Sequence, residues 1–217
     1  MGDVTGEYVE QIRSAFAFLQ EEYRFAETKV RRDRPPREGC DIEYRSSQTI
    51  VGIVVDEWGT VWSPTIGRLA DMGSFGSACI VSLDRIWEKE RAHARDLSML
   101  ASHNPEDVRE AWERVVVAGQ LEMRRTMEAT SPAPGEESTR RRLGAYAALL
   151  KQYSESFLSG DFSSWLDLQE YNWHWLVAGE VVRDARGEKG HALRELEGRF
   201  SNVAEYLQAL RRECGRD

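Results

Sequence analysis

The sequence predicts an α+β protein, in which an N-terminal helix packs on a small antiparallel sheet of three to four strands and a C-terminal helical bundle follows. Three observations predict this fold class. Apolar residues recur every three or four positions in residues 7–25, the apolar period changes to two near residue 40, and helical spacing returns from residue 84 onward.

The first helix is expected over residues 7–25, where six apolar residues form one stripe: Tyr8, Ile12, Ala15, Phe16, Leu19 and Tyr23. A helix with one apolar stripe needs a surface to cover. Residues 29–39 contain two prolines and show no apolar period, so the sequence predicts a loop there.

The strands are expected between residues 40 and 82. Residues 40–45 alternate apolar and polar, which is typical of a strand with one buried face. Residues 49–55 are continuously apolar and rich in β-branched residues, which predicts a central strand covered on both faces. Residues 56–59 are a plausible hairpin connection, and Pro64 places a third strand, residues 60–66, at a sheet edge.

The remaining part of this half is less regular. Residues 78–82 could add a fourth strand. Residues 73–77 (GSFGS) resemble a glycine-rich phosphate loop only distantly, because no Gly-Lys-Ser/Thr ending and no βαβ context accompany them. They are interpreted as a connection.

Helices are expected for the rest of the chain. Asn104, Pro105 and the two acids that follow form a helix start, since Asn caps free amides and Pro is tolerated at the first helical position. The proline-rich residues 130–135 end that helix. Three more helices are predicted at about 137–158, 162–184 and 191–212. The domain prediction is an α+β portion, 1–100, and a helical portion, 101–217, packed on the first as one compact unit.

Composition excludes several function classes. The chain has 217 residues and a net charge of −8, with 13 basic against 17 acidic residues in 1–100 and 16 against 20 in 101–217. Such uniform acidity disfavours nucleic acid and membrane surfaces as partners. The three cysteines form no pair with metal-ligand spacing, so no metal site and no cofactor are predicted. The sequence shows neither a signal peptide nor a membrane span, which predicts a cytoplasmic protein.

The helix at 162–184 has aromatic and aliphatic residues on nearly every side. Because Trp and Tyr are frequent interface anchors, four of them are candidate binding residues: Trp165, Tyr171, Trp173 and Trp175. The alternative is a central helix of the bundle, with these residues in its core.

The same helix carries Asp167, Glu170 and His174 on one stripe. A carboxylate three or four residues from a histidine could orient a general base, but no HExxH or equivalent metal motif is present. A solvated stripe is the alternative. The last helix repeats apolar residues from Leu193 to Leu210 in a heptad pattern, which predicts packing within the bundle or, alternatively, a homodimer seam.

Three segments, residues 16–25 (FAFLQEEYRF), 42–46 (IEYRS) and 50–56 (IVGIVVD), resemble small uncharacterised bacterial immunity-type proteins of polymorphic toxin systems. The resemblance covers roughly residues 10–70 and rests on hydrophobic pattern. It implies a protein that binds and inhibits a partner and has no catalytic residues. The helical extension beyond about residue 100 is not part of that pattern.

These observations together predict a non-enzymatic, protein-binding role, with immunity or antitoxin-like inhibition of a basic partner as the specific hypothesis. Two alternatives remain open. One is an enzyme of unrecognised type that uses the stripe of Asp167, Glu170 and His174, and the other is a structural homo-oligomer assembled through the last two helices.

Overall fold

The computed structural model describes residues 4–32, 39–56, 58–102, 104–130, 136–185 and 201–216. The chain forms two compact units, and each of them joins two stretches of sequence. The first contains Met1–Ala70 and Arg124–Phe162, and the second contains Asp71–Met123 and Ser163–Asp217. Each unit therefore combines residues from both sides of residue 100.

The predicted α+β class is confirmed, although the sheet has five strands where three to four were expected. Their order is β1-β2-β3-β4-β5, so each strand neighbours the one before it in sequence, and the first four pair antiparallel. The strands are β1 (Ala26–Arg32), β2 (Cys40–Arg45), β3 (Thr49–Val55), β4 (Thr65–Arg68) and β5 (Ile80–Ser82).

Two sequence predictions for the sheet were wrong in detail. The loop expected at 29–39 instead begins with the second half of β1, an edge strand whose charged residues hide any apolar alternation. The strand expected at 60–66 is reduced to an isolated bridge between Val55 and Val61, and regular pairing resumes only at β4, after Pro64. Proline cannot donate to a ladder, which accounts for the interruption. Residues 33–38 lie outside the described part of the chain.

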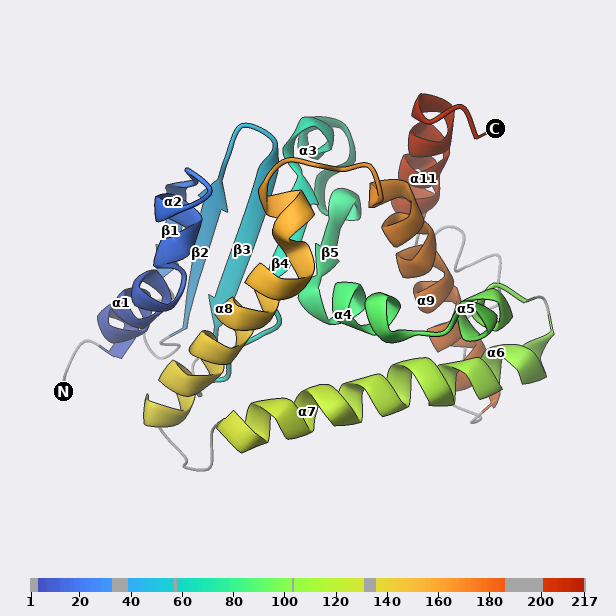
Figure 1. The fold of residues 1–217 in the computed structure, drawn as a ribbon, viewed down its shortest axis with the longest axis horizontal. Helices are drawn as coiled ribbons and strands as arrows, with labels where there is room; N and C mark the ends of the chain where they lie inside the picture. Colours follow the sequence, from blue (N-terminus) through green and yellow to red (C-terminus); the bar gives the residue numbers. More distant parts are fainter. Residues whose placement is uncertain are drawn as a thin grey trace. The chain divides into compact units, whose positions relative to one another are not determined.

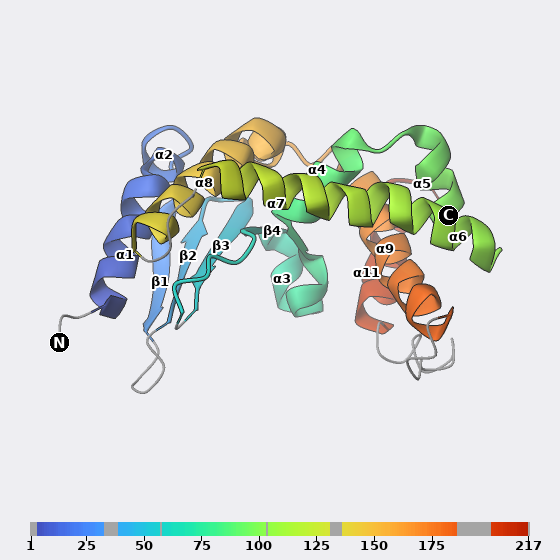
Figure 2. The same ribbon diagram turned by 90° about the horizontal axis from the view of Figure 1, so that it is seen from below.

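One face of the sheet in the first unit is covered by α1 (Val4–Ala15) and α8 (Glu136–Leu158), as Figures 1 and 2 show. The expected docking of the N-terminal helix on the sheet is therefore confirmed. The short helix α2 (Ala17–Glu21) follows α1. The covered face buries three cross-strand pairs of β2 and β3: Cys40 with Val55, Ile42 with Ile53, and Tyr44 with Val51.

The other face of β3 is buried at Ile50, which is 4% exposed, and open at Val54, so the expectation that residues 49–55 are covered on both sides fails only at the end of the strand. Val54, which points away from the helices, is 42% exposed. On the helical side, Thr49 donates its hydroxyl hydrogen to the carbonyl of Phe157 in α8 at 2.6 Å. The continuous apolar run therefore has one face that is buried throughout and a second face that offers apolar surface to solvent at Val54.

The second unit is mostly helical, and α9 contacts α4, α5, α6 and α11 in it (Figure 1). Residues 73–77, expected to be a connection, lie in α3 and η1. Besides α8, the described helices after the sheet's fourth strand are α3 (Leu69–Phe75), η1 (Gly76–Cys79), α4 (Leu83–Arg91), α5 (Ala94–Leu100), α6 (Pro105–Trp112), η2 (Glu113–Val117), α7 (Ala118–Thr130), α9 (Trp165–Ala185) and α11 (Ser201–Glu213).

The predicted helix start at Asn104 is confirmed, because its side-chain oxygen accepts a hydrogen bond from the backbone N–H of Glu106 at 3.1 Å. The three later helices are found as α8, α9 and α11. The part of the last helix expected at 191–200 lies outside the described residues. Within the described part, Leu207 and Leu210 of the apolar seam are buried.

Candidate functional site

Two of the four predicted binding residues, Trp165 and Tyr171, lie inside the second unit. Trp165 is 1% exposed and donates its indole N–H to the hydroxyl of Tyr206 at 2.7 Å, and Tyr206 in turn donates to Asp71. Tyr171 is 5% exposed and donates to a carboxylate oxygen of Glu88 at 3.2 Å. Buried and hydrogen-bonded in this way, both residues stabilise the packing of α9.

The other two, Trp173 and Trp175, are half-buried. The ring of Trp175 packs against Trp112 with centroids 4.9 Å apart, and the guanidinium of Arg85 lies over the same ring. These contacts cover part of the Trp175 ring. The assignment of the four residues to binding stays a prediction, and the burial of Trp165 and Tyr171 directs attention to other aromatic residues.

The stripe of Asp167, Glu170 and His174 is tied to the last helix of the second unit. Asp167 pairs with Arg216 at 2.7 Å, and Glu170 pairs with Arg211 at 3.0 Å. Both ion pairs connect residues of α9 with α11 or the residues just after it. Burial lowers the pKa of His174, although Glu170 opposes this effect. Among the described residues, no group of three or more His, Cys, Asp or Glu could hold a metal ion.

Exposed aromatic surface is found elsewhere, in the first unit. The large apolar side chains that are strongly exposed in the described part of the chain are Val54 (42%), Trp58 (80%), Trp62 (60%) and Leu121 (46%). Three of these four lie within residues 54–62, where β3 ends and the chain turns. We name Val54, Trp58 and Trp62, together with the connecting residues that the structure describes, the tryptophan turn.

Asp56 holds the tryptophan turn together. One of its carboxylate oxygens accepts hydrogen bonds from the backbone N–H groups of Trp58 at 3.0 Å and Thr60 at 2.8 Å. The other accepts from the indole N–H of Trp62 at 3.3 Å. The backbone N–H of Asp56 donates to the carbonyl of Thr60 at 3.0 Å, which closes the turn. A single side chain therefore fixes both the backbone and one of the two exposed rings.

The turn is also fastened to the helices behind it. Gly59 has a φ of +73°, and its carbonyl accepts a hydrogen bond from the hydroxyl of Thr139 in α8 at 2.9 Å. A Cβ atom at Gly59 would lie 2.9 Å from the hydroxyl oxygens of Thr139 and Tyr8. Only glycine fits both the backbone conformation and the space, so the turn rests closely on α1 and α8.

Val54 and Trp62 share the open face of the sheet. Val55 and Val61 form an antiparallel bridge, so Val54 lies opposite Trp62. The backbone N–H of Trp62 donates to the carbonyl of Val54 at 3.0 Å. Residues opposite one another in an antiparallel pair lie on the same face. The tryptophan turn therefore joins an apolar patch on the sheet to a second indole ring at the tip.

Sequence reasoning missed this surface because it assigned residues 56–59 to a simple connection and Trp62 to a strand. The available signal was the presence of two tryptophans within five residues, with a Gly between them and an Asp just before them. Turn residues lie at the surface, so an indole ring placed there has few neighbours that could cover it.

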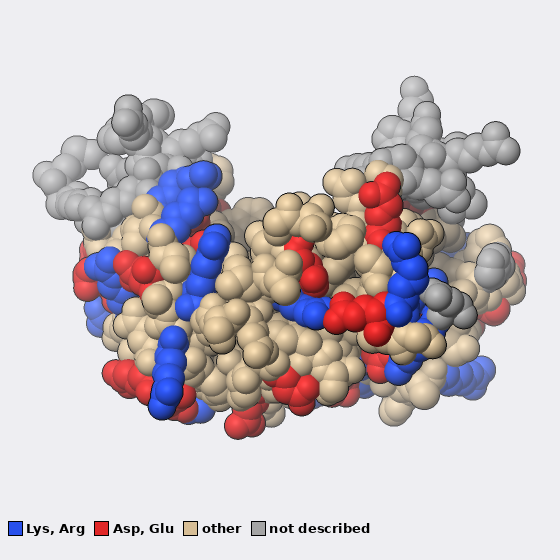
Figure 3. All heavy atoms as spheres, turned by 90° about the horizontal axis from the view of Figure 1, so that it is seen from above, with Lys and Arg blue, Asp and Glu red and all other residues tan. Residues whose placement is uncertain are grey.

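Charged side chains do not form a broad area of one sign on the face drawn in Figure 3, where basic and acidic groups are interspersed. On β2, Glu43 pairs with Arg45 at 2.8 Å, and Asp41 lies 3.8 Å from Arg31 of β1. The charges of the sheet therefore largely neutralise one another, and the net charge of −8 is a property of the whole chain.

No family model matches the chain, and neither a curated protein nor a solved structure is similar to it. Within the described residues, none of the helices combines the length and the apolar character that crossing a bilayer requires.

Proposed function

We propose that this protein acts by binding another protein, as an immunity- or antitoxin-like inhibitor, and that the tryptophan turn is its contact surface. The observation that carries the proposal is the exposure of Trp58 and Trp62, at 80% and 60%, on a turn held by hydrogen bonds. Large exposed aromatic side chains are the residues that most often anchor a protein interface.

The rigidity of the turn supports a binding role. A surface that is already ordered loses little conformational entropy when a partner docks, so more of the contact energy appears as affinity. Two hydrogen bonds supply this order. The carboxylate of Asp56 accepts one from the backbone N–H of Thr60 within the turn, and the carbonyl of Gly59 accepts one from the hydroxyl of Thr139 in α8. The rings themselves remain uncovered.

The chemistry of the chain favours a partner with a positively charged surface. The net charge of −8 accelerates encounters with a basic protein, and indole faces attract the cationic groups of Lys and Arg. An inhibitor that masks a basic active surface, such as one that binds nucleic acid, requires both properties.

The test is a binding assay with the full chain and a basic protein encoded beside it in the native host. The double variant Trp58→Ala and Trp62→Ala should weaken binding at least tenfold, and the association rate of the unchanged protein should fall as salt is added. Leu121→Ala is the matched control, because it removes an exposed apolar side chain from the second unit. It should bind like the unchanged protein.

The inhibitory part of the proposal has its own readout. The partner should arrest growth when produced alone, and co-production of this protein should restore growth, whereas the double tryptophan variant should not. Equal protection by the double variant, with unchanged affinity, would show that the tryptophan turn is not the contact surface.

A further inference from the structure

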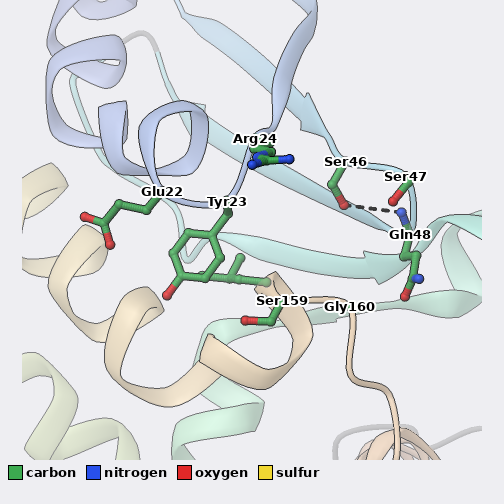
Figure 4. Close-up of a pocket in the computed structure, with 9 residues that line it drawn as sticks. Glu22, Tyr23, Arg24, Ser46, Ser47, Gln48, Ser159 and Gly160 are labelled. Carbon is green, nitrogen blue, oxygen red and sulfur yellow. Dashed lines mark hydrogen bonds between the residues drawn. The ribbon is translucent and has the colours of Figure 1, made fainter.

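A polar pocket of about 320 Å³ opens in the first unit, where the end of α2, the β2–β3 turn and the end of α8 meet (Figure 4). Three separate segments form its wall. Glu22, Tyr23 and Arg24 come from the first, Ser46, Ser47 and Gln48 from the second, and Leu158, Ser159 and Gly160 from the third.

Arg24 provides the positive charge of the pocket. Its guanidinium extends toward Ser46 in Figure 4, and it forms no ion pair with any residue in the described ranges. Glu22, the acidic residue of the wall, is instead paired with Lys151 at 2.7 Å. The negative charge in the wall is thus already neutralised, and the charge of Arg24 is available to a ligand.

The backbone of Arg24 lies in the left-handed region, with a φ of +59°. This conformation is unfavourable for a residue with a long side chain, because the Cβ atom crowds the following carbonyl oxygen. Glycine or asparagine would fit the position with less strain. An arginine kept in this strained conformation on the wall of a pocket points to a role for its charged group there.

Hydroxyl groups complete the donors of the pocket. Ser46 is held in place because its oxygen accepts hydrogen bonds from the backbone N–H groups of Gln48 at 3.3 Å and Thr49 at 3.0 Å. Within the part of the chain that the structure describes, the hydroxyls of Ser47 and Ser159 have no partner. They come from two different wall segments, so a bound group could receive hydrogen bonds from more than one of them.

Gly160 allows the third wall to come close to the second. Its φ is +86°, and a Cβ atom there would lie 2.5 Å from the side-chain oxygen of Gln48. Glycine at this position therefore lets the end of α8 pass beside the β2–β3 turn, which brings Ser159 to the pocket.

We infer that this pocket binds the phosphate group of a small molecule. A guanidinium donates through a planar fork, which satisfies two oxygens, and the hydroxyls of Ser47 and Ser159 can donate to the remaining oxygens of a tetrahedral group. A carboxylate has only two oxygens and would leave these hydroxyls without a use. The volume accommodates a phosphate ester as well as the free ion. This inference does not depend on the tryptophan turn.

Inorganic phosphate and phosphoserine are the probes for a calorimetric titration of the full chain, carried out at constant ionic strength. Both should bind saturably, with millimolar affinity for the free ion. Tighter binding of phosphoserine assigns the pocket to a phosphate ester, and equal affinity assigns it to free phosphate. Absence of saturable binding for both probes would overturn the inference.

Variants then locate the site. Arg24→Gln should weaken phosphate binding at least tenfold, and Ser159→Ala should weaken it severalfold. Arg24→Gly should lose binding to the same extent yet unfold at a temperature no lower than that of the unchanged protein, because glycine accepts the left-handed conformation. This variant therefore distinguishes the loss of the Arg24 guanidinium from unfolding of the protein. Arg109→Gln removes an exposed arginine of α6 and should bind phosphate normally. Phosphate binding by Arg24→Gly at the original affinity contradicts the assignment.

Discussion

Replacing Glu88 by glutamine should change how the stability of this protein depends on pH. Glu88 lies on α4, is 3% exposed, and accepts a hydrogen bond from Tyr171 at 3.2 Å. Arg85 is its nearest cation, at 3.5 Å, and the second carboxylate oxygen has no hydrogen-bond partner among the described residues. Burial raises the pKa of Glu88 from 4.5 to about 7, although Arg85 opposes the shift.

The direction of the effect follows from proton binding. Between pH 4.5 and about 7 the folded protein holds a proton on Glu88 that the unfolded chain has released. The free energy of unfolding therefore falls as pH rises through this window and levels off above it. The pKa of Glu88 differs by about 2.5 between the folded and unfolded states. At about 1.4 kcal/mol for each tenfold change in proton affinity, the free energy of unfolding falls by about 3 kcal/mol across this window.

Glutamine stays neutral at every pH and can still accept the hydrogen bond from Tyr171. The stability of Glu88→Gln relative to the unchanged protein should therefore increase by about 3 kcal/mol from pH 4 to pH 8. The attraction between Arg85 and the ionised carboxylate is already part of the pKa of Glu88, so it adds no separate change to this slope. The slope, and not the offset, is the quantity to compare.

Urea unfolding followed by circular dichroism at several pH values between 4 and 8 measures this slope. Glu90→Gln is the matched control, because Glu90 lies on the same helix with 55% of its side chain exposed, and its difference from the unchanged protein should stay nearly constant. A Glu88→Gln difference that is equally flat would refute the argument that the buried carboxylate is neutral at low pH and costly at high pH.

Four further substitutions test the packing and one helix cap. Gly52→Ala should cost about 1–3 kcal/mol in urea unfolding, since its Cβ would lie 2.7 Å from the hydroxyl oxygen of Thr65, whereas Gly144→Ala, with nothing within 4 Å, should gain up to about 1 kcal/mol. A neutral Gly52→Ala would contradict the close approach of β3 and β4. Asn104→Ala should cost about 1 kcal/mol through loss of the helix cap, and an unchanged midpoint would count against that cap. Trp165→Ala should cost about 3–5 kcal/mol by the same measurement, and a loss below 1 kcal/mol would contradict its burial.

The sequence predicted elements well where a local signal is strong. The cap at Asn104 combines three signals, an amide side chain, a proline at the first helical position and acids after it, and the helix begins there. The strand at 40–45 was recognised from its alternation, and its burial follows the same alternation. In these cases the local preference and the tertiary packing agree, so nearby residues suffice for the prediction.

Elements whose character depends on distant residues were predicted less well. β1 has little apolar alternation and becomes a strand by pairing with β2, which residues 26–32 alone do not reveal. The grouping of residues 124–162 with the N-terminal sheet is likewise a tertiary property. The pocket at Arg24 was also missed, because its first and third wall segments are separated by more than a hundred residues of sequence.

The tryptophans show why aromatic content alone does not identify a binding surface. Trp165 sits on a helix with apolar residues all round, and neighbouring elements cover it because the second unit surrounds that helix. Trp58 and Trp62 sit beside charged and small residues that suggest an ordinary turn, and they remain exposed because a turn at the end of a sheet has no element in front of it. Hydrophobic density in sequence therefore predicts burial, and an isolated aromatic residue in a turn predicts exposure. By this criterion a search for contact residues should begin at the tryptophan turn, where the rings are uncovered and their support is already ordered.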